Sequence, residues 1–306
     1  MKSLLTKEKN EMDACRICPR NCKANRAEGK SGYCGVPAGI RAARAALHFW
    51  EEPCISGREG SGTVFFSGCN LRCVYCQNHQ IAENETGREI TVDRLAQIFL
   101  ELKEKGANNI NLVTPSHYVP QIREAIVKAK GQGLNLPIVY NCGGYEGTDA
   151  LKSLEGFVDI YLTDFKYMDE ELAGKYSKAW DYPERAKEAL AEMVRQNPQP
   201  VFDDKGLMQK GVIVRHLLLP GAVKNARAVV KYVYETYRDQ VYLSLMSQYT
   251  PLPQVSDISP LNRKVTRREY ERLIEYTLEL GVVNAYIQEG ETARESFIPE
   301  FDYEGL

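Results

Sequence analysis

The sequence predicts an α/β fold in which six β/α units form a partial (β/α)6 barrel, TIM-like but with fewer units. From about residue 62, short apolar runs alternate with amphipathic stretches, an order typical of a parallel sheet covered by helices. The chain has 306 residues and 43% of them are hydrophobic, enough for one barrel-sized core and an appendage. We therefore expect a barrel over residues 61–306 and an N-terminal extension, with a small cysteine-rich metal-binding segment, over residues 1–60.

Six strands are expected, each a mostly apolar run between turn-forming residues. They cover residues 63–67, 109–113, 137–141, 158–163, 212–218 and 241–246. The run 282–288 predicts a closing or edge strand. Residues 36–60 are punctuated by Gly and Pro, and we expect them to be irregular.

Helical periodicity fills the intervals between the strands. Over residues 92–105, apolar side chains recur at i, i+3, i+4 and i+7, which marks one buried helix face. Pro183 suits the first turn of a helix, where its missing N–H costs nothing. The remaining helices are expected over residues 119–130, 183–195, 225–237 and 266–280.

Charge and targeting signals narrow the function classes. Lys and Arg number 39 and Asp and Glu 41, so the formal net charge is −2, which does not favour nucleic-acid or membrane binding. The N-terminal residues are too short and polar a run for a signal peptide, and no apolar run has transmembrane length. We expect a cytoplasmic protein whose nine cysteines act as metal ligands and reactive thiols rather than as disulfides.

Cys69, Cys73 and Cys76 follow the first predicted strand with the spacing C-x3-C-x2-C. Three thiolates are one too few for the four irons of a [4Fe–4S] cluster, each of which needs an outer ligand. The fourth iron would stay open to a small molecule. The alternatives are a zinc site or buried free thiols, but zinc sites more often use paired C-x2-C knuckles, and after Cys76 only His79 lies close enough to complete one.

A second group of cysteines lies near the N-terminus. Cys15, Cys18, Cys22 and Cys34 have the spacing C-x2-C-x3-C-x11-C. Four thiolates suit either a structural zinc ion or a fully ligated iron–sulfur cluster. Either metal would hold together a segment that is too small to have a core of its own. Cys54 stands alone, and a position near the cluster and a buried structural role are both open.

The ends of the predicted strands are the next candidates, because active residues of such barrels lie at the carboxyl ends of the strands. Thr114, Ser116 and His117 follow the second strand and offer acceptors for an ammonium group, although Ser116 also suits a helix cap. Asn141 ends the third strand as a hydrogen-bonding amide. Cys142 follows it, either as a small buried thiol or as a hydrogen donor or radical relay in the barrel.

The fourth and fifth strands end in charged residues. Asp164 and Lys166 lie two apart and share a face if the strand continues through them, so they form either a ligand site or an internal ion pair. Arg215 and His216 are adjacent within an apolar strand, where burial without partners is costly. We expect Arg215 to face the lumen of the barrel and His216 to face the helices.

The three-cysteine motif, with Tyr75 before its last cysteine, resembles the cluster motif of the radical S-adenosylmethionine (SAM) superfamily. Residues 14–280 resemble an uncharacterised branch of pyruvate formate-lyase activating enzyme homologues, through motifs that include Glu51-Glu52-Pro53-Cys54-Ile55-Ser56-Gly57, Cys73-Val74-Tyr75-Cys76-Gln77-Asn78, Asp164-Phe165-Lys166-Tyr167 and Arg215-His216-Leu217. The resemblance implies the radical SAM partial barrel, a [4Fe–4S] cluster on Cys69, Cys73 and Cys76, and SAM chelated by the open iron.

The resemblance also implies SAM contacts. They are expected from Tyr75, Asn78, Thr114, Ser116, His117, Asn141, Asp164, Lys166 and Arg215. The chain departs from the pattern at two strand ends. It lacks the Gly-Gly-Glu motif that many members carry after the second strand, and it has Gln248 and Tyr249 where related activating enzymes place a histidine.

The expected activity is reductive cleavage of SAM to a 5′-deoxyadenosyl radical that abstracts hydrogen from a substrate, as in an activating-enzyme-like radical SAM oxidoreductase. A glycyl radical enzyme is the expected protein substrate, and a flavodoxin or ferredoxin the expected reductant. The alternatives are radical modification of an RNA base or peptide side chain, and a non-enzymatic iron–sulfur adaptor.

Overall fold

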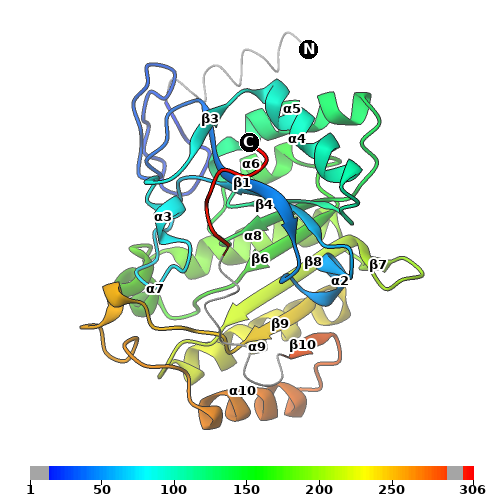
Figure 1. Ribbon diagram of the computed structural model, residues 1–306. Coiled ribbons are helices and arrows are strands. Elements are labelled where there is room, and N and C mark those ends of the chain that lie inside the picture. The colour runs from blue at the N-terminus through cyan, green and yellow to red at the C-terminus, as the bar shows by residue number, and fades with distance from the viewer. Residues whose placement is uncertain (1–13, 288–298) are drawn as a thin grey trace.

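The computed structural model describes residues 14–287 and 299–306, and its centre is one strongly curved sheet (Figure 1). The six expected strands are all present within one or a few residues of their predicted bounds. They are β2 (Ser61–Phe66), β4 (Ile110–Val113), β5 (Ile138–Cys142), β6 (Ile160–Asp164), β8 (Met208–Leu217) and β9 (Tyr242–Met246). A seventh strand, β10 (Ala285–Ile287), lies parallel to β9 at the edge, and Gln288 of the predicted run falls outside the described residues.

The order of the strands is β10-β9-β8-β6-β5-β4-β2-β1-β3, so the sheet is open and the prediction of a partial barrel is confirmed. Neighbouring strands from β2 to β10 run parallel, and their register aligns their carboxyl ends. Val113 of β4 pairs with Asn141 of β5, and Asp164 of β6 pairs with Arg215 of β8. This alignment brings polar residues that are far apart in sequence to one end of the lumen.

The prediction that residues 36–60 are irregular is wrong, because β1 (Ile40–His48) and the short helix α2 (Pro53–Ser56) lie within them. β1 runs antiparallel to β2, and β3 (Arg88–Ile90) runs antiparallel to β1. The alanines of β1 have low strand propensity, so the sequence pattern conceals the strand. Pairing with β2 and burial of Ala42, Ala43 and Ala45 create it. A strand of the predicted N-terminal extension therefore joins the main sheet.

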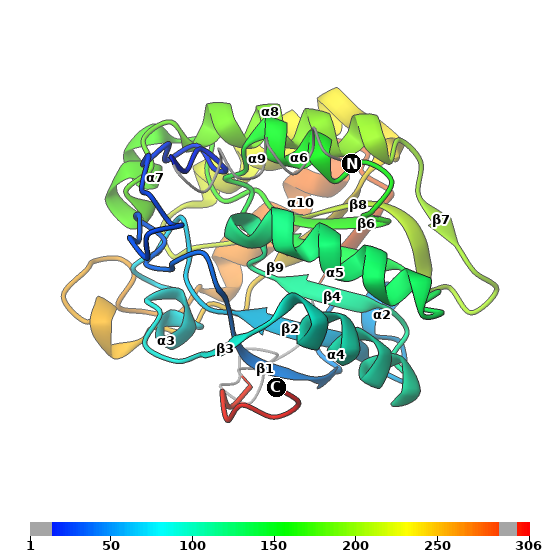
Figure 2. The ribbon, with the colours of Figure 1, turned by 90° about the horizontal axis from the view of Figure 1, so that it is seen from above.

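The five predicted helices are present and cover the outer face of the sheet (Figure 2). They are α4 (Val92–Glu104), α5 (Val119–Gly131), α8 (Tyr182–Gln196), α9 (Val223–Tyr237) and α10 (Arg267–Glu279). Pro183 lies in the first turn of α8, as expected. The periodicity did not indicate three shorter helices, α3 (His79–Ala82), α6 (Thr148–Ser153) and α7 (Glu170–Ser177). The short strand β7 (Val201–Phe202) pairs with β8 in a hairpin.

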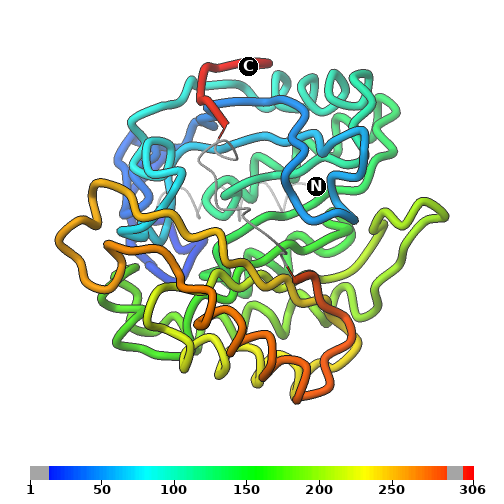
Figure 3. Tube along the Cα trace, turned by 60° about the horizontal axis from the view of Figure 1, so that its bottom comes forward, coloured from blue at the N-terminus to red at the C-terminus, as the bar shows by residue number. Residues whose placement is uncertain are grey.

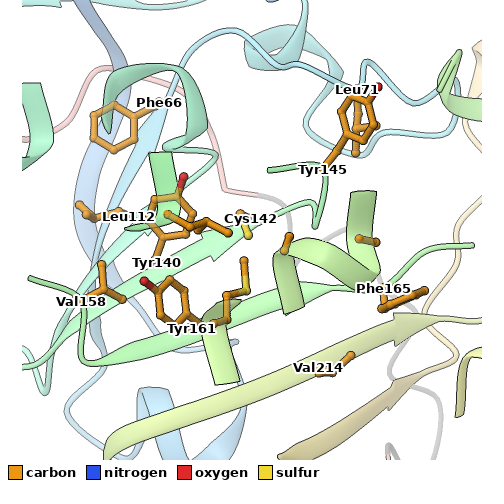
Figure 4. Packing of buried hydrophobic residues seen from close by; sticks show 14 of the residues in the cluster. Phe66, Leu71, Leu112, Tyr140, Cys142, Tyr145, Val158, Tyr161, Phe165 and Val214 are labelled. Atoms are coloured by element: carbon orange, nitrogen blue, oxygen red, sulfur yellow. The ribbon is translucent and has the colours of Figure 1, made fainter. Parts of the chain in front are cut away.

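The main core lies between the sheet and these helices (Figure 4). Tyr140 of β5 and Tyr161 of β6 are fully buried there and make an edge-to-face contact with ring centroids 5.9 Å apart. The C-terminal segment 299–306 returns to β1 (Figure 3), where the Ala45 N–H donates to the Glu304 carbonyl at 2.8 Å. The C-terminal residues of the chain are thereby hydrogen-bonded to β1.

Candidate functional site

A cavity of about 260 Å3 opens at the carboxyl ends of the parallel strands. Eleven of the predicted site residues line it. They are Cys69, Tyr75, Cys73, Cys76, Asn78, Thr114, Asn141, Cys142, Asp164, Lys166 and Arg215. Thr114 adopts a left-handed backbone with φ 59° directly after β4. Residues that the sequence did not single out as ligands also line the cavity, among them Gln77, Met246 and Gln248.

The three cysteines lie on an irregular loop that leaves the end of β2. The Leu71 N–H donates to the Cys69 sulfur at 3.3 Å, and the Cys76 N–H donates to the Cys73 carbonyl at 3.0 Å. Gly68 begins the loop with φ 88°, and a Cβ there would lie 2.6 Å from Val36. Glycine is thus required for conformation and space. Burial, together with the neighbouring Cys73 thiol, raises the pKa of Cys69 in the metal-free chain.

Arg215 is the centre of a buried polar network. Its Nε donates to Asp164 Oδ1 at 2.9 Å and its Nη2 donates to Asn141 Oδ1 at 2.6 Å. Lys166 Nζ donates to Asp164 Oδ2 at 2.6 Å, so Asp164 bridges two cations. Burial acts to raise the pKa of Asp164, but Lys166 and Arg215 outweigh it and lower that pKa below its ordinary value. The carboxylate therefore stays ionised beside the cavity.

Glu51 is a member of this network that the sequence analysis did not identify as a site residue. Its Oε2 accepts from Arg215 Nη1 at 3.0 Å, and its Oε1 accepts from Asn111 and Asn141 at 3.1 and 3.2 Å. Burial raises the pKa of Glu51, and Arg215 opposes that shift. The signal in the sequence was the acidic pair Glu51-Glu52 before the proline that starts α2. This pair becomes informative only when the position of Glu51 in the lumen of the barrel is known.

Two predicted residues, Ser116 and His117, are not among those that line the cavity. Ser116 is buried and donates to Glu146 Oε1 at 2.7 Å. The Nε2 of His117 lies 2.8 Å from the Ser67 carbonyl oxygen, and burial lowers the pKa of His117 to about 3. Both side chains turn away after β4 because η1 (Ser116–Tyr118), a short 3-10 helix, begins there. The structure therefore does not bring them together with the other candidates.

Cys142 is 3% exposed and borders the cavity at the end of β5. Its sulfur lies 3.4 Å from Thr163 Oγ1, and Figure 4 shows it beside the ring of Tyr140. Burial, and then the negative charge of Glu146, raises the pKa of this thiol well above its ordinary value. The thiol is therefore neutral. Cys54 is buried away from the cavity, in a separate cluster with residues of β5, β6 and β8.

The N-terminal cysteine segment contains no helix or strand over residues 14–39. Cys15 and Cys34 are buried, Cys18 is half-buried and Cys22 is exposed. Among the described residues, no group of three or more His, Cys, Asp or Glu surrounds a position suited to a single metal ion. Burial, and to a smaller extent the neighbouring Cys34 and Cys15, raise the pKa of Cys18; burial is also the main cause of the raised pKa of Cys15, to which Cys22 adds.

Arg20, within this segment, holds it against residues 68–76, which we name the cluster loop for its predicted cluster cysteines. Its Nε donates to the Asn70 carbonyl at 2.8 Å and its Nη2 donates to the Ser177 carbonyl at 2.9 Å. A third donation, from Nη1, reaches the Lys178 carbonyl. The guanidinium also lies over the ring of Tyr33, 4.0 Å from its centroid.

Among the helices of residues 14–287, none combines the length and hydropathy needed to cross a membrane.

Comparisons with known proteins identify relatives of this chain. The chain is 27% identical over 283 residues to "Uncharacterized protein MJ0674" of Methanocaldococcus jannaschii, a match covering 89% of this chain and 78% of that protein. It is 26% identical over 178 residues to the pyruvate formate-lyase-activating enzyme of Staphylococcus epidermidis, covering 55% of this chain and 65% of that enzyme. The chain therefore spans slightly less than two thirds of the activating enzyme.

A solved structure supports the fold. Methylornithine synthase (PylB) superposes with a TM-score of 0.50 at 15% identity, over 80% of this chain and 65% of that one. The family model of the radical SAM superfamily matches residues 63–221, just over half of the chain, from β2 to the end of β8 and the turn beyond it. That match contains the three cysteines, Asp164, Lys166 and Arg215. The predicted family is confirmed: this chain belongs to the radical SAM superfamily.

Proposed function

We propose that this protein is an activating-enzyme-type radical SAM enzyme, which abstracts a hydrogen atom from a glycine of a partner protein. Members of the superfamily are enzymes, and the type of reaction is the part proposed. The similarity to the S. epidermidis activating enzyme supports a protein substrate. The observation that carries the proposal is that Asp164, Lys166 and Arg215 line the same cavity as the three cysteines.

The residues present fit the two groups that the family implies. Cys69, Cys73 and Cys76 offer three thiolates for a [4Fe–4S] cluster, which leaves one iron for SAM. Lys166 and Arg215 offer cations for the carboxylate of SAM, and Asp164 offers an ionised acceptor for hydroxyl or ammonium groups. When bound, the cluster supplies the electron that cleaves SAM to the 5′-deoxyadenosyl radical. Tyr75, Asn78, Thr114 and Asn141 line the same space and are proposed SAM contacts.

Release of 5′-deoxyadenosine tests the first half of the proposal. Anaerobically reconstituted protein, SAM and dithionite should yield it, and a Cys73→Ala variant should not. The matched control is Cys54→Ala, which removes a buried thiol outside the cavity and should retain the release. If the reconstituted wild-type protein takes up iron but releases no 5′-deoxyadenosine, a non-enzymatic iron–sulfur adaptor replaces the proposal.

Deuterium transfer tests the second half. Pyruvate formate-lyase labelled with α-deuterated glycine is the probe. The expected result is deuterium in 5′-deoxyadenosine together with a glycyl electron paramagnetic resonance signal on the probe. If 5′-deoxyadenosine forms without either signal, the activating role on this probe is rejected. In that case, a screen of peptides and RNA for the same deuterium transfer decides between the alternative substrates.

We also propose that Cys15, Cys18, Cys22 and Cys34 bind a second metal centre, zinc or an iron–sulfur cluster. The density of thiols, four within residues 15–34, supports it. A flavodoxin- or ferredoxin-type protein is the proposed reductant. Metal analysis of a Cys18→Ser/Cys34→Ser variant tests the second site. A loss of zinc with unchanged iron identifies zinc, a loss of iron identifies a cluster, and no change in either metal rejects the site.

A further inference from the structure

Three buried hydroxyl groups form a chain that ends on the sulfur of Cys73. Ser177 Oγ donates to Cys73 Sγ across 3.0 Å, and Ser177 is completely buried at the end of α7. Tyr167 Oη lies 2.8 Å from Ser177 Oγ. Tyr75 Oη lies 2.7 Å from Tyr167 Oη. None of these contacts enters the network of Arg215 described above, so the chain needs a separate explanation.

The direction of the chain follows from the chemistry of its last member. A cysteine that ligates iron is a thiolate and carries no proton, so Ser177 must donate to it. Each hydroxyl has a single proton. Ser177 therefore accepts from Tyr167, and Tyr167 accepts from Tyr75. All the protons point toward the sulfur, and hydrogen bonds arranged in this way polarise one another.

The surrounding structure fixes the donor in place. The Val74 N–H donates to the Tyr176 carbonyl at 2.9 Å, which ties the cluster loop to the last turn of α7. Arg20 Nη2 donates to the Ser177 carbonyl at 2.9 Å. Tyr167 is fully buried, with its ring 5.3 Å from that of Tyr182 in an edge-to-face contact.

We propose that the Ser177 hydroxyl, oriented by Tyr167 and Tyr75, raises the reduction potential of the cluster that Cys73 ligates. This rests on the proposed function only in requiring the cluster. A one-electron reduction adds negative charge to the iron–sulfur core, and a hydrogen bond donated to a ligand sulfur stabilises that charge. The electron comes from an external low-potential donor. Ser177 is thus a positioning residue that makes the cluster easier to reduce.

The test is an anaerobic redox titration of the reconstituted full chain, followed by the electron paramagnetic resonance signal of the reduced cluster. Ser177→Ala should shift the midpoint to a more negative potential. At a fixed solution potential near the midpoint, the ratio of reduced to oxidised cluster should fall about tenfold, which corresponds to about 59 mV for one electron. Ser177→Thr, which retains the hydroxyl, should restore the wild-type ratio. Tyr167→Phe should give a smaller shift of the same sign.

The control is Ser153→Ala, which removes a hydroxyl that bonds only to the Ala150 carbonyl in α6 and should leave the midpoint unchanged. Iron content is measured for every variant. If the wild-type chain binds no cluster, the proposed function fails. If Ser177→Ala takes up no iron, Tyr167→Phe decides the question. Midpoints of Tyr167→Phe and of any loaded Ser177→Ala equal to that of the wild type overturn the inference and leave the proposed function intact.

Discussion

Arg215 donates from Nη1 to Glu51 across 3.0 Å, which joins two residues 164 positions apart in the sequence. Glu51 comes from the loop between β1 and β2, and Arg215 from the carboxyl half of β8. Their side chains are 9% and 16% exposed. The N-terminal part of the chain therefore contributes Glu51 to the polar network beside the cavity, in addition to contributing β1 to the sheet.

Replacing Glu51 separates the role of its charge from that of its hydrogen bonds. Glu51→Ala leaves Arg215 Nη1 and two asparagine amides without an acceptor and should lower the free energy of unfolding by about 3 kcal/mol. Glu51→Gln keeps one acceptor oxygen but places its NH2 group against a donor at the other position, so it should cost less than the Ala variant, about 1–2 kcal/mol. Urea denaturation measures both. Glu304→Ala, at an exposed ion pair with Arg44, is the control and should cost at most about 1 kcal/mol. Equal losses for Ala and Gln would contradict this account.

Asp164→Asn should weaken SAM binding. The substitution removes the charge that holds Lys166 and Arg215 beside the cavity, and a lost charge-assisted hydrogen bond corresponds to roughly tenfold to hundredfold in affinity. Equilibrium binding of SAM to the reconstituted protein measures the effect. Asp149→Asn, whose side chain is 98% exposed on α6, should bind like the wild type. An Asp164→Asn variant with unaltered affinity would remove Asp164 from the proposed SAM site.

His216 should make the fold sensitive to acid. It is 1% exposed, its Nδ1 lies 2.7 Å from the Phe165 carbonyl, and burial lowers its pKa from 6.5 to about 4 despite that bond and the nearby Asp164. Between pH 6.5 and about 4, His216 binds a proton in the unfolded chain but stays neutral in the folded chain. The stability that this histidine contributes is therefore complete above pH 6.5 and is lost as the pH falls through 4, up to roughly 3 kcal/mol.

Urea titrations at several pH values between 4 and 7 measure this loss, and His216→Asn should flatten it. The slope should become shallower by up to about 1.4 kcal/mol per pH unit, one proton's worth. His48 and His117, whose pKa values burial also lowers, keep part of the slope in the variant. If the free energy of unfolding depends on pH equally in wild type and variant, His216 takes up its proton in the folded chain as readily as in the unfolded chain, which contradicts the prediction.

Arg20→Ala should loosen the cluster loop. Arg20 bonds to the carbonyl of Asn70, on the loop that carries Cys73, and to the carbonyl of Ser177, at the end of α7. Losing about 2 kcal/mol of local stability would speed hydrogen exchange of peptides covering residues 68–76 about thirtyfold. The exposed Arg16, four residues earlier, provides the control Arg16→Ala, which should exchange like the wild type. Unchanged exchange in both variants would mean that the cysteine segment does not restrain this loop.

Local patterns were sufficient for six strands and the five long helices, because each has its own hydrophobic periodicity; the strands are β2, β4, β5, β6, β8 and β9. They failed for β1, whose alanines become a strand only by pairing with β2. Strand-end reasoning located Asp164, Lys166 and Arg215 because a parallel sheet aligns its carboxyl ends. It did not anticipate that a turn after β4 directs the side chains of Ser116 and His117 toward other partners.

The sequence by itself determined the family, the three-cysteine motif and the strands that carry the charged residues, because spacing along one strand or loop is a local property. Only the tertiary structure decided that Glu51 joins Arg215 and that the hydroxyls of Tyr75, Tyr167 and Ser177 form a chain that ends on Cys73. Those contacts link residues as much as 164 positions apart, and no local pattern encodes which distant groups will share a buried site. The cost of leaving a buried polar group unpaired is what selects them once the chain has folded.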